Sequence, residues 1–159
     1  MTAPSPDAPD LMFLLSSASQ ALTGEHAAGL AELGISPRAH CVLCKARPGG
    51  LTQRQIGDLC GIDKTTMVVT LDQLEGAGLV RRRPSPTDRR ARLVEVTPEG
   101  EKVLARAQQI AARIQGDVLA TLAPPDRETF LRCLESLVGG RLARSGPCGP
   151  CGPGSSPRP

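Results

Sequence analysis

Residues 51–100 decide the fold of this chain, and they read LTQRQIGDLCGIDKTTMVVTLDQLEGAGLVRRRPSPTDRRARLVEVTPEG. Thr52 and Gln55 have the spacing of a capping box, which predicts that a short helix opens at Thr52. Residues 60–62 contain a glycine and are typical of the corner in a helix-turn-helix. The short helix is expected to present an apolar face made of Ile56 and Leu59.

A second helix is predicted from Asp63, a good N-cap residue, to about Glu75. Its inward face consists of apolar residues three or four positions apart, namely Met67, Leu71 and Leu74. The opposite face is small and nearly uncharged, and it is centred on Thr65, Val69 and Asp72. Such a face suits insertion into a DNA major groove about 12 Å wide. An amphipathic helix of a bundle is the alternative, but outward-facing valines argue against it.

Two strands are predicted at residues 79–83 and 93–97, joined by a wing loop at residues 84–91 that is too polar and proline-rich to be buried. Residues 81–92 contain six arginines and one aspartate, a net charge of +5, whereas the whole chain carries +3. This asymmetry is typical of proteins that contact phosphates, and a solvated surface run is the alternative. Next to a helix-turn-helix, the run favours a wing that contacts double-stranded DNA.

The same segments resemble the MarR family of winged-helix transcription regulators. The resemblance is carried by LTQRQI at residues 51–56, IDKTTM at 62–67, LDQLEGAGLV at 71–80, and PTDRR at 86–90 followed by VTPEG at 96–100. It implies a mainly α fold with a small β wing, in which a winged helix-turn-helix domain is joined to a helical dimerisation region. It also implies a homodimeric repressor that binds an inverted repeat and is released by a small-molecule effector.

In the family, the second helix reads the major groove and each wing inserts an arginine into the minor groove. The resemblance assigns that insertion to Arg90, with Asp88 as its orienting partner. Many relatives carry an arginine where this chain has Val69, so a guanine-reading role does not transfer to that position, and a valine there can contact a thymine methyl. The predicted DNA-contacting residues are Gln53, Lys64, Thr65, Thr66, Val68, Val69, Gln73, Arg81, Asp88, Arg89, Arg90 and Arg92.

The length of 159 residues indicates a single domain, which we place at residues 1–145 with a reading module at about 51–97. Residues 146–159 are rich in glycine, proline and cysteine and are predicted to form a disordered tail. Dimerisation helices are predicted at about 10–33 and within 98–143, where Pro124 and Pro125 separate a long helix from a final one. Ser36 with Pro37 begins another helix before the reading module. Packing within one subunit is the alternative for the apolar seam of the last helices, which we assign to dimerisation. That seam comprises Val103, Ala107, Ile110, Ile114, Val118, Phe130, Leu134 and Leu137.

The cysteines suggest an alternative function, a thiol-based redox sensor on the same scaffold. Cys41 and Cys44 are three residues apart on a predicted helix, a spacing that brings two thiols close, although ordinary core packing also explains them. Cys148 and Cys151 lie in a Cys-Gly-Pro-Cys sequence like the active-site tetrad of thioredoxin-like proteins. The strand and helix that flank the tetrad in that fold are not predicted here.

No metal site, cofactor or enzymatic activity is expected, because two histidines without a motif assemble neither a ligand set nor a catalytic group. Phe13 and Phe130 are the only Phe, Trp or Tyr residues, so the effector is implied by the resemblance alone. The longest apolar run, residues 11–15, is far shorter than the roughly 20 residues that span a bilayer. We therefore expect a cytoplasmic protein without a membrane partner.

Overall fold

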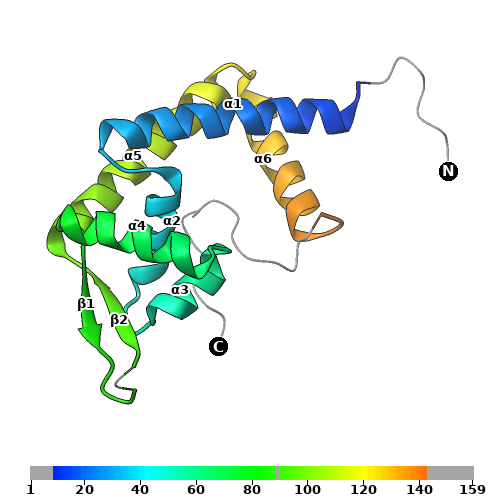
Figure 1. The fold of residues 1–159 in the computed structure, drawn as a ribbon. Helices are drawn as coiled ribbons and strands as arrows, with labels where there is room; N and C mark the ends of the chain where they lie inside the picture. The colour runs from blue at the N-terminus through cyan, green and yellow to red at the C-terminus, as the bar shows by residue number, and fades with distance from the viewer. Residues whose placement is uncertain (1–8, 89, 143–159) are drawn as a thin grey trace.

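The computed structural model describes residues 9–142 with the exception of Arg89 (Figure 1). This part of the chain forms six helices and one two-stranded antiparallel sheet, which confirms the predicted fold class. In chain order the elements are α1 (Leu11–Glu32), α2 (Pro37–Ala46), α3 (Gln53–Cys60), α4 (Lys64–Gly76), β1 (Val80–Pro84), β2 (Arg92–Val96), α5 (Pro98–Ala120) and α6 (Pro124–Gly139). None of the described helices has the length and apolar character needed to cross a membrane.

The predicted side-chain caps fix where the helices of the central region begin. Ser36 Oγ accepts from the backbone N–H of Ala39 at 3.1 Å, with Pro37 in the first turn of α2. Thr52 and Gln55 form both halves of the capping box at the start of α3. These polar side chains satisfy backbone donors that the helix itself leaves open, so the helix starts can be read from the sequence.

The core lies where α2 meets α3, α4, α5 and β2. Its fully buried side chains include Leu30, Val42, Leu43, Ile56, Leu71 and Val94. The predicted inward face of α4 is confirmed, because Met67, Leu71 and Leu74 are all buried. The prediction for α3 is wrong in one residue: Leu59 is 44% exposed, since neighbouring elements cover only the side of this helix that carries Ile56 and Gly57.

The wing is an antiparallel hairpin in which Val80 lies opposite Val96 and Pro84 lies opposite Arg92. Each strand is displaced by one residue from its predicted range. The backbone N–H of Val94 also donates to the carbonyl of Leu51 at 3.1 Å, and Thr52 forms an isolated bridge with Leu93. The start of α3 is therefore tied directly to β2, which fixes the wing beside the helix-turn-helix.

The wing loop is not wholly exposed, contrary to the prediction. Ser85 is buried, and its hydroxyl accepts from the backbone N–H groups of Thr87 and Asp88, each at 3.3 Å. Its own backbone N–H donates to the carbonyl of Ala91 at 3.1 Å. A small polar residue can be buried here because these hydrogen bonds satisfy it within the loop.

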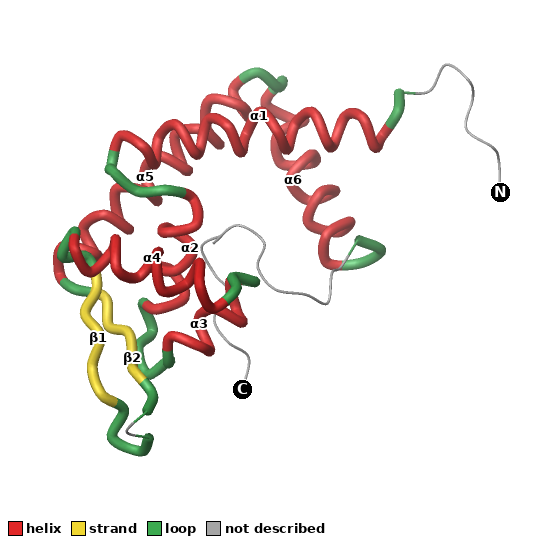
Figure 2. The backbone as a smooth tube through the Cα atoms, in the orientation of Figure 1, coloured by secondary structure: helices red, strands yellow, loops and turns green. Residues whose placement is uncertain are grey.

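Helices α1 and α5 run side by side above the reading module (Figure 2). Their close approach depends on Gly29, where a side chain would collide with Ile110. The first half of α1, residues 11–22, and the whole of α6 contain no buried residue. We call these two segments the outer helices; their exposed large apolar residues are Leu11, Met12, Phe13, Leu14, Leu22, Phe130, Leu137 and Val138.

Part of the predicted dimer seam packs within the chain instead. Ala107 is fully buried in the core, so its side chain is not available to a second subunit and the assignment is wrong for this residue. Ile114 is 9% exposed and lines a hollow between α1 and α5, so its dimer role stays a prediction. Val103 packs against the same core, and Ile110 lies against Gly29 of α1. The spacing of three or four residues correctly predicted an apolar face on α5. The first half of that face packs against α1 and α2 of the same chain. The dimer role of Val118, Phe130, Leu134 and Leu137 stays a prediction.

Candidate nucleic-acid interface

Helix α4 begins at an aspartate that caps it. Asp63 Oδ1 accepts from the backbone N–H of Thr66 at 3.0 Å, and Asp63 Oδ2 accepts from the Thr66 hydroxyl at 2.5 Å. These hydrogen bonds hold the pKa of the Asp63 carboxyl below its usual value. Gly61 lies just before the cap in a left-handed conformation, φ 63°, which turns the chain sharply between α3 and α4.

The outward face of α4 carries most of the residues predicted to contact DNA bases. Thr65 and Gln73 are exposed, and Val69 is 52% exposed although it is apolar. Thr66 and Val68 are partly buried, and the Thr66 hydroxyl is already engaged by Asp63. Thr65, Val69 and Gln73 are therefore the side chains of this face that are best able to reach a ligand.

A groove of about 690 Å³ lies between α3, the first turns of α4 and the wing. Its cationic lining comes from all three elements, namely Arg54, Lys64, Arg90 and Arg92, and Gln53 lines it too. Asp58 and Asp88 are its carboxylates. Sequence reasoning did not single out Arg54, although its position on the polar side of the short helix α3 was a signal that pointed to it.

The wing loop is held in shape by its own backbone. Asp88 Oδ1 accepts from the backbone N–H of Arg90 at 2.8 Å, and the Asp88 carbonyl accepts from the N–H of Ala91 at 3.0 Å. The resemblance implied that Asp88 orients the Arg90 side chain, but the contact in the structure is with the Arg90 backbone. Arg90 itself is exposed. Arg89, the other arginine of the loop, lies outside the described residues.

The arginines of β1 are engaged in ion pairs. Arg81 Nε and Arg83 Nε lie 2.7 Å and 3.1 Å from the same Glu95 oxygen on β2. The cationic patch predicted at residues 81–92 is therefore only partly open, because nearby carboxylates offset the charge of β1. The role of Arg81 in DNA contact stays a prediction; its ion pair is exposed, and such pairs contribute about 1 kcal/mol or less.

Arg82 connects the wing to α4. Its guanidinium contacts Glu75 at 2.5 Å and Asp72 at 2.7 Å, and its backbone N–H donates to Glu75 Oε1 at 3.0 Å. The hydrogen bonds from Arg82 hold the pKa of Glu75 below its usual value of 4.5, and the two carboxylates raise the pKa of Arg82. This cluster fixes the angle between the hairpin and the outward face of α4.

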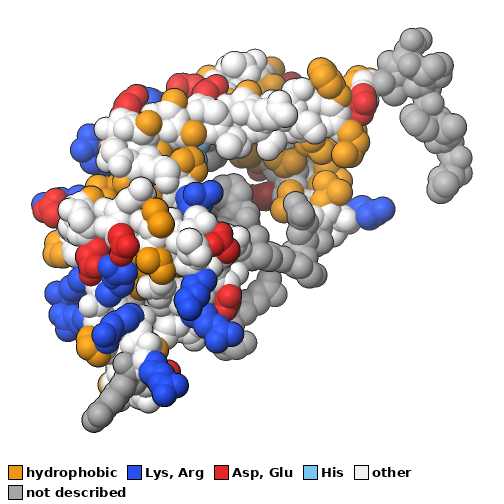
Figure 3. Space-filling model, in the orientation of Figure 1, with side chains coloured by type: hydrophobic (Ala, Val, Ile, Leu, Met, Phe, Trp, Pro, Cys, Tyr) orange, Lys and Arg blue, Asp and Glu red, His pale blue; other side chains and the backbone are white. Residues whose placement is uncertain are grey.

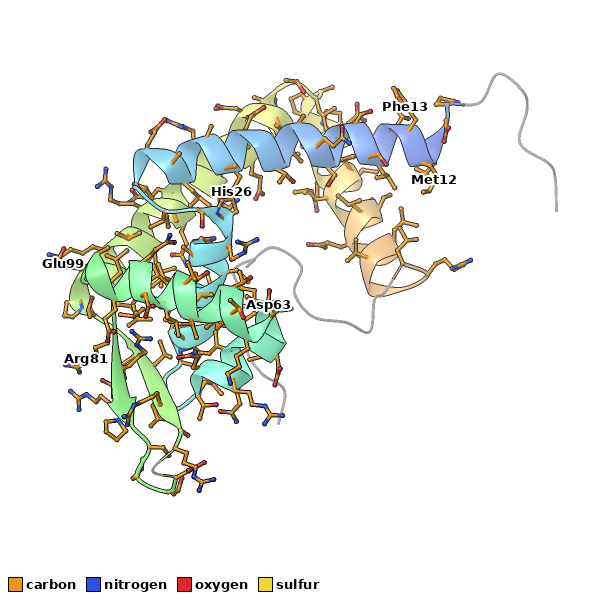
Figure 4. All side chains as sticks on the ribbon, viewed as in Figure 1. Met12, Phe13, His26, Asp63, Arg81 and Glu99 are labelled. Atoms are coloured by element: carbon orange, nitrogen blue, oxygen red, sulfur yellow. The ribbon has the colours of Figure 1, made fainter. Side chains whose placement is uncertain are left out.

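The distribution of charged side chains over the molecule agrees with this geometry. In Figure 3, Lys and Arg side chains gather over the reading module and the wing, whereas the visible face of α1 is mostly uncharged. In Figure 4, Asp63 marks the start of α4 beneath α1, Arg81 lies on the hairpin, and Met12 and Phe13 lie at the opposite end of α1. The cationic side chains of the groove and the exposed apolar residues at the start of α1 therefore lie far apart.

Each cysteine of the predicted pair, Cys41 and Cys44, contacts another residue in the structure. Cys41 Sγ lies 3.3 Å from Cys60 Sγ on α3, whereas Cys44 Sγ lies 3.5 Å from His40 Nε2. The two histidines also meet, with ring centroids of His26 and His40 5.4 Å apart. Within the described residues no group of three or more histidine, cysteine or carboxylate side chains is arranged to hold a metal ion. Cys148 and Cys151 lie outside the described residues.

Comparison with known proteins identifies the family. A family model described as MarR family matches residues 33–91. The transcriptional regulator HosA of Escherichia coli O111:H- is 32% identical over 103 residues, which cover 58% of this chain and 76% of that protein. The chain belongs to the MarR family. A transcriptional regulatory protein for the hcr operon of Thauera aromatica is 34% identical over 105 residues, which are 65% of this chain and 63%, just under two thirds, of that relative.

Solved structures of MarR from E. coli share the fold. Wild-type MarR without ligand matches with a TM-score of 0.74 at 22% identity, covering 83% of this chain and 98% of that one. A MarR mutant complexed with operator DNA matches with a TM-score of 0.63 at 23% identity, covering 80% and 93%. The curated relatives of this MarR family chain are described as transcriptional regulators rather than enzymes.

Proposed function

We propose that this MarR family chain is a homodimeric transcriptional repressor that binds an inverted repeat in double-stranded DNA. The observation that carries the proposal is the cationic groove, because Arg54, Lys64, Arg90 and Arg92 converge on it from three elements beside the outward face of α4. Phosphate contacts from such groups position a protein on DNA, while side chains on α4 read base edges.

The proposed contacts divide into two groups. Thr65, Val69 and Gln73 are exposed on α4 and face the major groove, where Val69 contacts a thymine methyl. Arg90 enters the minor groove beside it, and Arg54, Lys64 and Arg92 contact phosphates. Gln53 lies at the rim of the groove, and Arg82 keeps the wing at the angle that lets both groups of contacts form together.

The dimer is supported by the outer helices. They expose large apolar residues along two elements at the end of the molecule opposite to the wing, and exposed apolar residues in such number are typical of an interaction site. Pairing of two chains through these helices turns both α4 helices toward one face of the duplex, which an inverted repeat requires.

We further propose that a small-molecule effector releases the operator, as it does in many members of the family. Phe13 and Phe130 are exposed in the single chain, so neither ring encloses a ligand there. An effector site that uses these rings is therefore completed by dimerisation. Operator release by phenolic carboxylates, followed by fluorescence anisotropy, tests this part of the proposal; a ligand that binds without changing operator affinity would contradict it.

Arg90→Ala tests the wing contact. The control is Arg106→Ala, which removes an exposed arginine on α5 outside both the groove and the outer helices. Log affinity falls with log salt in proportion to the phosphates neutralised, so losing Arg90 from both subunits should flatten that slope by up to about 2 units. Thr65→Ala should leave the slope nearly unchanged and relax preference at one base position of each half-site. Wild-type affinity and slope in a folded, dimeric Arg90→Ala protein would refute the wing contact.

A further inference from the structure

Two thiols from different helices meet at the contact between α2 and α3. Cys41 lies in the middle of α2, and Cys60 is the last residue of α3, 19 positions later in the chain. Their sulfur atoms are 3.3 Å apart. Both side chains are partly rather than fully buried, so a small solute has access to them.

We propose that Cys41 and Cys60 form a reversible intrachain disulfide when a hydroperoxide oxidises them. A disulfide has a sulfur–sulfur distance of about 2.05 Å, so the sulfur atoms must approach by about 1.2 Å. The sulfurs already face each other across the contact between α2 and α3.

The oxidation balances with hydrogen peroxide as the only co-reactant. The thiolate of one cysteine attacks a peroxide oxygen, the O–O bond breaks, and the departing hydroxide takes a proton and leaves as water. The resulting sulfenic acid is attacked by the thiolate of the second cysteine, the S–O bond breaks, and a second water leaves. Two thiols together lose two electrons and two protons, and one peroxide is reduced to two waters.

The geometry favours this pair over the other described cysteines. Cys44 shares a helix with Cys41, but its sulfur contacts His40 Nε2 at 3.5 Å. Cys133 lies on α6, which Figure 1 draws apart from α2 and α3. A disulfide between residues 41 and 60 ties α3 to α2 and restricts the unfolded chain, which stabilises the folded state.

Peptide mapping of the full chain tests the site directly. Trypsin releases Cys41 with Cys44 in the peptide Ala39–Lys45 and Cys60 in the peptide Gln55–Lys64. After peroxide treatment and blocking of remaining thiols, we expect these peptides to be linked with the loss of two hydrogens, and fragmentation to place the bond on Cys41. Dithiothreitol should separate them. A bond through Cys44 would overturn the proposal. So would peptides that stay unlinked in a protein whose two thiols have been shown to react with a small thiol reagent.

Variants provide matched controls, made in a chain with Cys133, Cys148 and Cys151 changed to serine to suppress links between molecules. Cys44→Ser should keep the peroxide-dependent link and a reversible rise in the melting temperature of several degrees. Cys41→Ser and Cys60→Ser should lose both, and the mass measurement on the natural sequence stands even if a variant folds poorly. A link that persists in Cys41→Ser would overturn the assignment.

A second measurement asks whether the disulfide reaches the DNA, and this step rests on the proposed function. Cys60 directly precedes Gly61 at the corner that sets the direction of α4, so we expect oxidation to lower operator affinity severalfold, reversibly. Reduced protein that binds no DNA would contradict the proposed function and leave the disulfide standing. Oxidised protein with unchanged affinity would overturn only this step.

Discussion

The reading module and the outer helices differ in how completely a single chain buries their apolar residues. In the module, Ile56, Leu71 and Val94 are fully buried against α2, and polar contacts from Arg82 and Leu51 fix the wing to the helices. In the outer helices no residue is buried, and Met12, Phe13 and Val138 are among the most exposed apolar side chains of the described chain. The apolar residues of the module are buried within one chain, with the help of α2, α5 and the end of α1, whereas those of the outer helices stay exposed.

Ile114 lies at the junction of these two regions, so Ile114→Asp should have the largest effect. The new carboxylate would be largely buried between α5 and α1, in a hollow that already carries Glu25, Glu32 and Asp117 against the cation Arg113. Burying it should cost several kcal/mol, a large share of the stability of a domain. Urea unfolding should show this loss, and Gln115→Asp, which places the same charge on the exposed neighbour, should not. A well-folded Ile114→Asp chain that has lost only dimerisation would place Ile114 at the dimer seam after all.

Leu137→Asp tests the outer helices alone. Leu137 is 39% exposed in the single chain, so the change should leave the fold intact but weaken dimerisation about 30-fold or more, equivalent to about 2 kcal/mol. Sedimentation velocity at several concentrations measures this, and Ser136→Asp provides the same charge about 100° around the helix. Undiminished dimerisation of Leu137→Asp would move the interface away from this face of α6.

The smallest effect is expected within the module, at Glu75. Its pKa is lowered by Arg82, so the carboxylate stabilises the folded chain fully above its usual pKa of 4.5, and this contribution is lost as pH falls from 4.5 through the lower folded value. The stability difference between wild type and Glu75→Gln should therefore be largest at neutral pH and shrink below 4.5. Urea unfolding across this range measures it, with Glu128→Gln as an exposed control. A difference that does not vary with pH would show that the ion pair is not its cause.

The helix-turn-helix could be predicted from the sequence because local chemistry determines it. Capping residues at Ser36, Thr52 and Asp63 and the glycine at position 61 act within a few residues of themselves, so their consequences are visible in the chain. The apolar spacing of α4 likewise predicts a single buried face, because Met67, Leu71 and Leu74 lie on the same side of the helix.

The remaining features depend on contacts between distant residues. The pairing of Arg82 with Glu75, and that of Arg81 with Glu95, could not be read from a run of arginines, because the carboxylates lie elsewhere in the chain. The contact between Cys41 and Cys60 likewise joins residues far apart in the chain, so it could not be predicted from local spacing. The burial of Ala107 could not be predicted either, because helical spacing identifies an apolar face without showing which neighbour covers it.

The central claim is that two reading modules, held by one pair of outer-helix surfaces, bind a single operator. Selection of bound fragments from genomic DNA, followed by footprinting of the selected sites at known protein stoichiometry, tests it most directly. We predict an inverted repeat whose half-sites are about 10 bp apart centre to centre, occupied by two chains. Isolated half-sites bound by one chain with full affinity would contradict the claim.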